Sequence, residues 1–413
     1  MSIAARAAAE VRTDADHVRR TTAAAPAAWA SLPRSLAIAA VATLSLLGAG
    51  CSGGPDAIVL AVALLPAELP VYRSVIGEFE RRSGRRVMIV PQQYSDIRRA
   101  LGAESKAGRG TLDLVELDVY SLAVAAGDVA ELDEQALARE IDALDENALA
   151  AGRFGGLRFL PHRLSWQAMI YDHEAIASPP ASWSELVEVA RAHSGRIAIK
   201  GALYEGLACD VLPLVWAAGA SGEDFGEEGA EAALGMLAEL APHLHPHSET
   251  FKEAAIAEAM ARGEIVLHWN WPAVMSLYQS QGLAPQRIRS APLPAGPRGR
   301  ATVLGGGYVA VPSAAPHRDD ALALLRFLLS REVQQRLATE LGWFSGRRDV
   351  APPTDNTALD GFVAMRPHVR PRPERKDYPR LSRAWQQAAR AVLFENVAPA
   401  KALATARESM KEN

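Results

Sequence analysis

Acidic and amide side chains follow the first three predicted strands of this 413-residue chain, at the point where each strand ends. Glu68 lies in a turn after the first strand, Gln93 follows the second, and Asp118 ends the third. In a sheet with helical crossovers, ligands bind beyond the carboxyl ends of the strands. A solvated loop position would explain each side chain alone, but their shared placement predicts a site that accepts hydrogen bonds from a polar ligand.

Tryptophans gather at three places, although aromatic residues make up only 6% of the chain. Trp166 is the first, Trp269 and Trp271 flank an Asn directly after a predicted strand, and Trp343 is the last. A flat aromatic ring packs well on the apolar face of a sugar ring, while carboxylates and amides accept its hydroxyl hydrogen bonds. Each Trp could equally be a core side chain, but together with the strand-end acids they indicate a carbohydrate ligand.

Three other features could indicate a metal site, a dinucleotide site or a reactive thiol, but the surrounding sequence does not support these interpretations. Three histidines at 243–247 suggest a metal-carrying loop, but only Glu249 stands nearby as a further ligand, so we expect a polar loop and no bound metal. The glycines at 305–307 lack the strand–loop–helix context of a dinucleotide site, and no cofactor is expected. Cys209 lies in an apolar stretch without an activating partner, which indicates a buried, inert thiol.

Paired carboxylates leave an enzymatic alternative open. Glu68, Asp118 and Glu205 could supply the two acids of a secreted carbohydrate-active hydrolase, which needs one carboxyl group with a raised pKa. No other feature of the sequence resembles a hydrolase. A binding protein that is not an enzyme is therefore the preferred hypothesis.

Composition and element order indicate how these residues are positioned. The chain is 49% hydrophobic with a net charge of −4, which suits two domains and makes nucleic acid an unexpected partner. The densest basic run, 366–375, alternates with Pro and is typical of a loop. From residue 57 onward apolar strand-like runs alternate with helical stretches, which predicts an α/β protein with mainly parallel sheets.

The amino-terminal segment predicts export. Residues 35–50 form an uncharged apolar run, shorter than the ~20 residues of a membrane-spanning helix, behind several arginines. The run ends in Leu-Gly-Ala-Gly before Cys51, which resembles a bacterial lipobox. We expect residues 1–50 to be a lipoprotein signal peptide, Cys51 to carry the lipid, and 51–56 to form a tether; an ordinary cleaved signal is the alternative. The mature protein would then lie in the periplasm or on the outer face of the cell membrane.

Six short motifs in order carry a family resemblance over most of the mature chain. They are residues 114–119, 179–186, 204–209, 270–272, 291–294 and 304–306. Together they resemble the extracellular solute-binding proteins of ABC sugar importers, especially the maltose- and trehalose-type binders. The resemblance implies a monomer with a two-lobed periplasmic-binding-protein fold, whose mainly parallel sheets are joined by hinge crossover strands. A sugar, expected to be an oligosaccharide or disaccharide, would be captured between the lobes and delivered to the permease subunits of the importer.

The resemblance also implies boundaries and contacts. Lobe 1 is expected at 57–168 and 268–311, and lobe 2 at 169–267 and 312–413, with crossings near 166–171, 268–271 and 312. The expected sugar contacts by resemblance are Glu68, Asp118, Tyr204, Glu205, Trp271, Gly305, Gly306 and Arg347. Position alone adds Gln93, Trp166, Trp269 and Trp343.

Two departures from the sugar-binder pattern bear on the ligand. Ser165 stands where such proteins often have Asp, and Gly307 stands where many have a stacking Trp. A neutral hydroxyl makes hydrogen bonds about half as strong as those of a carboxylate. We therefore expect a different or bulkier glycan than the ligands of maltose and trehalose binders. The alternative is that neighbouring aromatic residues compensate and the same disaccharide still binds.

Overall fold

The structure is a computed structural model that describes residues 57–66, 68–351, 357–373, 375 and 377–411. The predicted signal peptide, Cys51 and the tether lie outside the described residues. Within the described part of the chain, no helix is long and apolar enough to cross a membrane.

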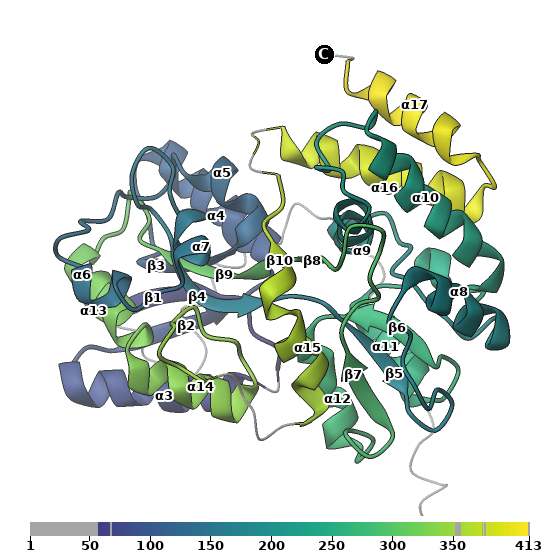
Figure 1. Cartoon of the computed structure of the whole chain (residues 1–413). Helices are drawn as coiled ribbons and strands as arrows, with labels where there is room; N and C mark the ends of the chain where they lie inside the picture. Colours follow the sequence, from purple (N-terminus) through teal and green to yellow (C-terminus); the bar gives the residue numbers. More distant parts are fainter. Residues whose placement is uncertain (1–56, 67, 352–356, 374, 376, 412–413) are drawn as a thin grey trace, which may run out of the picture. The chain divides into compact units, whose positions relative to one another are not determined.

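The first sheet has five strands in the order β2-β1-β3-β9-β4 (Figure 1). They are β1 (Ile58–Val62), β2 (Val87–Pro91), β3 (Leu114–Asp118), β4 (Leu160–Ser165) and β9 (Gly305–Ala310). β1 pairs in parallel with β2 and β3, whereas β9 runs antiparallel to both β3 and β4. The carboxyl ends of β1 to β4 and the start of β9 therefore lie along one edge of the sheet.

Helix α3 (Leu69–Ser83) shows how the sequence builds the layers around this sheet. Its residues Tyr72, Val75, Ile76 and Phe79 are buried at i, i+3, i+4 and i+7, the spacing of one helix face. The helix ends at Gly84, whose φ of 72° is a left-handed conformation that glycine adopts without strain. Helices α4 (Tyr94–Ala107), α5 (Leu122–Ala125), α6 (Ala138–Ile141) and α7 (Glu146–Ala150) complete this part of the chain.

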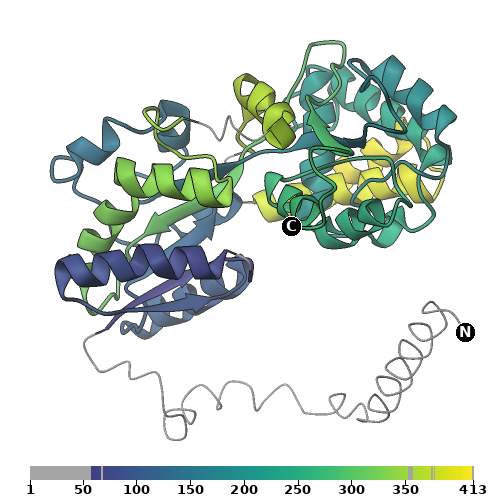
Figure 2. The same ribbon diagram turned by 90° about the horizontal axis from the view of Figure 1, so that it is seen from below.

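The structure corrects the expected boundary at residue 312. Helices α13 (Arg318–Leu328) and α14 (Arg331–Leu341) were expected in lobe 2, yet their buried side chains share a core with those of α3, β1 and β9. Figure 2 shows α3 beside this helical pair. The chain returns to the first sheet through β9, so the helices that follow it cover that sheet. We define lobe 1 as β1 to β4, β9, α3 to α7, α13 and α14.

The second sheet has three strands in the order β6-β5-β7, all antiparallel. They are β5 (Ala168–Asp172), β6 (Leu267–Asn270) and β7 (Ile288–Ala291). The prediction of parallel strands thus holds for β1 to β3 and not here. The expected placement of residues 268–311 in lobe 1 is also wrong for β6 and β7, because both pair with β5.

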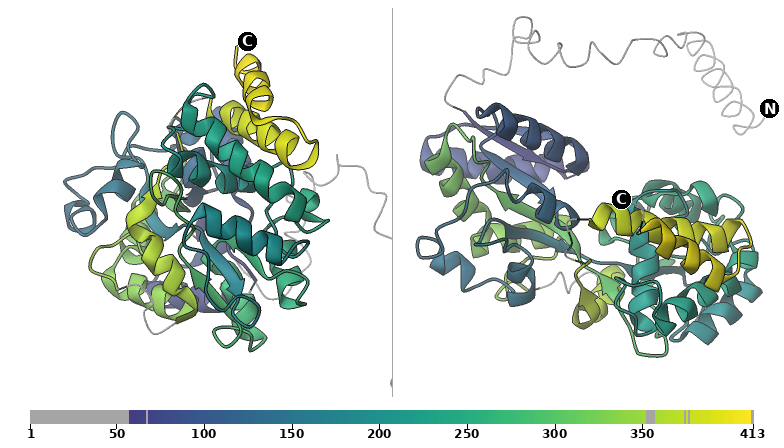
Figure 3. Two further views of the ribbon diagram at one scale, coloured as in Figure 1. Left: turned by 45° about the vertical axis from the view of Figure 1, so that its right-hand side comes forward. Right: turned by 90° about the horizontal axis from the view of Figure 1, so that it is seen from above.

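Helices surround the second sheet. They are α8 (Trp183–Ala192), α9 (Glu205–Ala217), α10 (Glu228–Leu240), α11 (Glu253–Ala261), α12 (Met275–Ser280), α15 (Asp360–Met365), α16 (Tyr378–Phe394) and α17 (Pro399–Ser409). Figure 3 shows α16 and α17, in yellow, against α10. We define lobe 2 as this sheet with these helices.

Segments that cross between the lobes lie side by side. Gln167, between β4 and β5, donates its backbone N–H to Thr302 Oγ1 (3.1 Å), and that hydroxyl donates to the Gln167 carbonyl (2.9 Å). Thr302 belongs to β8 (Thr302–Val303), which leads into β9 and pairs with β10 (Val369–Arg370). The first expected crossing is thus correct, but the second lies at 302–305 and not at 268–271, because β6 stays within lobe 2.

Candidate functional site

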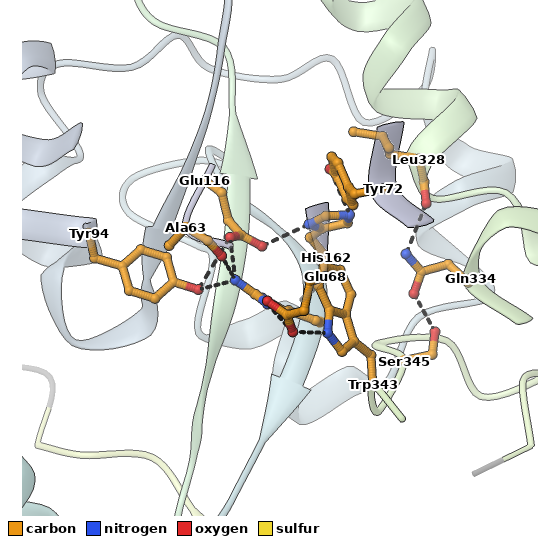
Figure 4. Close-up of polar contacts among 11 residues, drawn as sticks. Ala63, Glu68, Tyr72, Tyr94, Glu116, His162, Leu328, Gln334, Trp343 and Ser345 are labelled. Atoms are coloured by element: carbon orange, nitrogen blue, oxygen red, sulfur yellow. Dashed lines mark hydrogen bonds and ion pairs between the residues drawn. The ribbon is translucent and has the colours of Figure 1, made fainter. Parts of the chain in front are cut away.

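Glu68 sits at the carboxyl end of β1 and is held by groups of lobe 1. Its Oε1 accepts a hydrogen bond from Trp343 Nε1 (2.7 Å), and its Oε2 accepts one from the Leu65 backbone N–H (2.7 Å). The guanidinium of Arg163 lies 3.7 Å from Oε1. Glu68 and Trp343 are both predicted site residues. The structure brings them together, and they are hydrogen-bonded to each other (Figure 4).

A buried charged cluster lies beside Glu68. Arg163, from β4, donates to Glu116 Oε2 (2.9 Å), to Tyr94 Oη (3.1 Å) and to the Ala63 carbonyl. His162 Nδ1 lies 2.8 Å from Glu116 Oε1. Burial alone would raise the pKa of Glu116, but the Arg163 charge and the His162 hydrogen bond outweigh it and hold the pKa below its ordinary value.

This cluster explains a departure that the sequence left open. A Cβ atom at Gly307 would overlap the carboxylate of Glu116, so no side chain fits there. Sequence reasoning missed Glu116 and Arg163, although a Glu in the middle of the otherwise apolar strand Leu114–Asp118 was a visible signal. A Trp side chain at position 307 would thus collide with the carboxylate of Glu116 on the neighbouring strand.

Asp118 and Glu205, both predicted site residues, meet at one arginine. Arg372 Nη2 donates to Asp118 Oδ1 (2.9 Å), and its Nη1 donates to Glu205 Oε1 (3.0 Å). Asp118 ends β3 in lobe 1, whereas Glu205 begins α9 in lobe 2. Burial raises the pKa of Asp118 even though the charge of Arg372 opposes that rise. Arg372 lies in a loop, as the run 366–375 predicts, but the sequence carries no signal that this loop reaches both carboxylates.

A hollow with aromatic walls adjoins Arg372. The ring of Tyr120 lies 5.1 Å below the guanidinium, close enough for a cation–π contact. The hollow is lined by residues of lobe 1 and by residues of the segment that leads into α16. Its lining is Val119, Tyr120, Ala123, Ala151, Phe154, Pro371, Arg372, Pro373, Arg375 and Tyr378.

Trp271 lies against the start of β9. A Cβ atom on Gly305 would approach within 2.6 Å of Trp271 Cζ3, so the glycine lets the indole ring pack on the strand. Gly306 has a φ of 135°, and a Cβ there would overlap the Arg163 carbonyl. Trp271 remains partly exposed. Its ring therefore offers a surface at the edge where the lobes join.

The remaining predicted residues are engaged elsewhere. Trp166 is 2% exposed and donates to the Phe362 carbonyl (2.6 Å), and Trp269 is 4% exposed in the lobe 2 core. Arg347 forms two hydrogen bonds with Asp349, both 2.7 Å long. Trp166 and Arg347 therefore have protein partners for their polar side-chain atoms, and Trp269 packs in the core of lobe 2.

Tyr204 and Gln93 lie at helix starts. Tyr204 precedes α9, and Lys252 Nζ lies 5.2 Å from its ring centre. Burial raises the pKa of Tyr204, so it stays a neutral phenol. Gln93 precedes α4 and is exposed. Gln93 is therefore accessible at the edge of lobe 1, whereas the hydroxyl of Tyr204 is buried.

The histidine loop and the thiol have ordinary surroundings. His245 stacks on Phe251 with ring centres 5.3 Å apart, and the described residues hold no group of three side chains arranged as metal ligands. Cys209 is buried, and this burial raises the pKa of its thiol even though Arg372 Nη1 lies 3.6 Å from its Sγ and opposes that rise. A neutral thiol is a poor nucleophile, which fits the prediction of an inert residue.

Family comparison defines the class of protein. Residues 74–371, more than half of the chain, match the model of the bacterial extracellular solute-binding protein family. The chain belongs to this family, which confirms the predicted resemblance.

Two curated relatives are similar over part of the chain. A probable ABC transporter-binding protein of Deinococcus radiodurans is 26% identical over 189 residues, 40% of this chain and 44% of the relative. A putative 2-aminoethylphosphonate-binding periplasmic protein of Salmonella typhi is 27% identical over 212 residues, 49% and 58% of the two chains. The chain thus spans about half the length of the curated relatives it matches.

Solved structures confirm the two-lobed periplasmic-binding-protein fold. Maltose-bound MalE3 of T. maritima superposes with a TM-score of 0.75 at 23% identity, covering 86% of this chain and 98% of that one. A solute-binding protein of Thermotoga lettingae with α-D-tagatose also gives 0.75, at 21% identity and coverages of 86% and 98%. The maltotriose-binding protein of Thermus thermophilus gives 0.73, at 20% identity and coverages of 86% and 99%.

Proposed function

We propose that this protein captures a sugar between its two lobes and delivers it to the permease subunits of an ABC importer. The observation that carries the proposal is the meeting of Asp118 from lobe 1 and Glu205 from lobe 2 at Arg372, beside a hollow with aromatic walls. Lobe-spanning sites of this kind close on small ligands by hinge motion. The maltose, tagatose and maltotriose complexes of proteins with the same fold support this choice.

Charge balance favours a neutral sugar over a phosphonate. The guanidinium of Arg372 already pairs with two carboxylates, and that of Arg163 pairs with Glu116. Neither cation is left free to neutralise an anionic ligand. Tyr120 and Trp271 add aromatic surfaces of the kind that pack on sugar rings.

The hydrolase alternative is less well supported. Glu205 Oε1 accepts from Arg372 and from Tyr378 Oη (2.5 Å), while Oε2 accepts from Ser382 Oγ (2.6 Å). A glycosidase needs both carboxyl groups free to act on the bond and its water. Analysis of each sugar after incubation with the protein would reveal hydrolysis products if this alternative held.

A panel of mono-, di- and trisaccharides, with 2-aminoethylphosphonate included, tests the proposal by thermal shift and calorimetry. We expect one sugar to raise the melting temperature of the protein. Maltose and trehalose should bind more weakly than this sugar, because Ser165 replaces a carboxylate.

Trp271→Ala should weaken binding of the preferred sugar ~30-fold, because the loss of a stacking ring costs on the order of 2 kcal/mol. Trp271→Phe keeps a ring and should lose much less. Binding of the phosphonate alone, or equal affinity of both variants, would contradict the proposal.

We further propose that Cys51 is lipidated and holds the protein at the outer face of the membrane. The motive is the lipobox-like run before this residue. Cys51→Ala should move the protein from the membrane fraction to the soluble fraction, measured by immunoblotting after ultracentrifugation. Identical fractionation of the wild type and the variant would reject the anchor.

A further inference from the structure

Arg372 is a buried charge that joins the two lobes. Only 6% of the residue is exposed, and it contacts Asp118 of lobe 1 and Glu205 of lobe 2 through different nitrogens. It also donates to the carbonyl of Leu304, on the crossing segment between β8 and β9 (3.2 Å). A guanidinium buried this far from water needs such partners to offset its desolvation.

The two ends of this contact differ in how firmly they are held. Glu205 is fixed within lobe 2, because Tyr378 and Ser382 of α16 also donate to its carboxylate. Asp118 has a looser setting: its Oδ1 accepts from Arg372 and from the Tyr120 backbone N–H (3.1 Å). Among the described residues nothing donates to its Oδ2, and the side chain is 21% exposed. Arg372 is therefore part of lobe 2 and reaches across to lobe 1.

We propose that Arg372 is a positioning residue of the ligand site: anchored on Glu205, it holds Asp118 with Oδ2 free for a ligand hydroxyl and ties the lobes together before the ligand arrives. This inference rests on the proposed function for its ligand and extends it. The contact between Arg372 and Asp118 then serves both ligand binding and lobe closure. A ligand that hydrogen-bonds to Asp118 favours the same lobe arrangement that Arg372 stabilises.

In this arrangement Asp118 is oriented to accept a hydrogen bond from the ligand only while Arg372 holds it. Without Arg372, the carboxylate would lose a charge-assisted hydrogen bond that fixes its orientation. A ligand hydroxyl would then have to order the side chain itself and bring the lobes together, which lowers affinity. Burial raises the pKa of Asp118, and the charge of Arg372 opposes that rise.

The first experiment needs no ligand. Spin labels at Lys106→Cys on α4 and Glu239→Cys on α10, in a Cys51→Ser background, report the distance between the lobes by pulsed electron resonance. Cys209 is 1% exposed and should stay unlabelled. We expect Arg372→Met and Asp118→Asn to broaden the distance distribution toward longer values. Arg287→Met is the matched control, because Arg287 pairs with Asp172 inside lobe 2. Unchanged distributions in both variants would overturn the proposal.

The second experiment measures affinity for the sugar that the panel identifies. Each single variant should bind at least ~10-fold more weakly, and the double variant should bind about as weakly as Arg372→Met alone, since the two residues act as one contact. Additive losses would show independent roles and overturn the positioning role. Asp118→Asn keeps the acceptor for the Tyr120 N–H, so it decides the question if Arg372→Met fails to fold. If no sugar binds the wild type, the proposed function fails. The distance measurement still tests whether Arg372 ties the two lobes together, because it needs no ligand.

Discussion

Replacing Lys200 with Met is expected to lower the free energy of unfolding by about 3–5 kcal/mol. Lys200 and Asp210 form an ion pair inside lobe 2, and both side chains are fully buried. Lys200 Nζ also donates to the Trp269 carbonyl (3.1 Å), while Gln167 Nε2 donates to Asp210 Oδ1 (3.1 Å). The substitution leaves a buried carboxyl group without its counter-charge. Chemical denaturation followed by circular dichroism would measure the loss.

Two further variants separate the lost pair from lost packing. Lys200→Met combined with Asp210→Leu removes both charges and should recover much of the stability, because an apolar pair of similar volume avoids the desolvation cost. Arg262→Met removes a cation paired with Glu264 on the surface and should leave the unfolding curve unchanged. A double variant no more stable than Lys200→Met would contradict the electrostatic explanation.

The Asp210 carboxyl group also gives lobe 2 a dependence on pH. Burial raises its pKa to about 6 from an ordinary value of 3.8, despite the nearby Lys200 charge. The folded state therefore binds a proton more tightly than the unfolded state does. The stability that this group contributes is complete below about pH 4 and falls as the pH rises toward 6.

Arg163→Met is expected to cost a similar ~3–5 kcal/mol in lobe 1. Arg163 neutralises the fully buried Glu116, donates to Tyr94, and lies 4.2 Å from the ring of Trp343. With Arg163 present, the pKa of Glu116 lies below its ordinary 4.5, so its contribution to stability persists above that pH and is lost on acidification. Without Arg163, burial raises this pKa, and the deficit of the variant should shrink as the pH falls from 8 to 5.

Urea denaturation of the wild type and the variant at several pH values would test both parts. Arg153→Met is the control, because Arg153 pairs with Glu134 at a site where both side chains are more than 40% exposed. It should change the free energy of unfolding by less than about 1 kcal/mol at every pH. A deficit of Arg163→Met that grows on acidification would reject the assigned role of Glu116.

Several features were predictable because local physics determines them. The apolar runs of β1 and β3 and the i, i+3, i+4 spacing of Tyr72, Val75 and Ile76 identify strand and helix from adjacent residues alone. Gly84 and Ser182 marked a helix end and a helix start in the same way. The order of short motifs was enough to indicate the solute-binding family, which the match over residues 74–371 confirms.

The lobe boundaries depended on tertiary pairing. Nothing local to α13 and α14 states which sheet they cover, since any apolar helix face can pack on either core. Their place in lobe 1 follows from β9, which lies between β3 and β4. Trp166 is a second example, because its burial also depends on tertiary packing. The sequence predicts a stacking surface there, but the side chain is buried and donates to the Phe362 carbonyl.

The class of protein, the alternation of elements and the strand-end acids Glu68 and Asp118 are all predictable from sequence. The contacts of those acids depend on how distant segments pack together. Arg372 lies 254 residues from Asp118 and 167 from Glu205, and Arg163 lies 47 from Glu116. A loop arginine becomes the partner of two distant carboxylates only when folding brings the three groups together and buries the guanidinium. Their electrostatic interaction strengthens as the local dielectric falls, and no pattern of neighbouring residues encodes that burial.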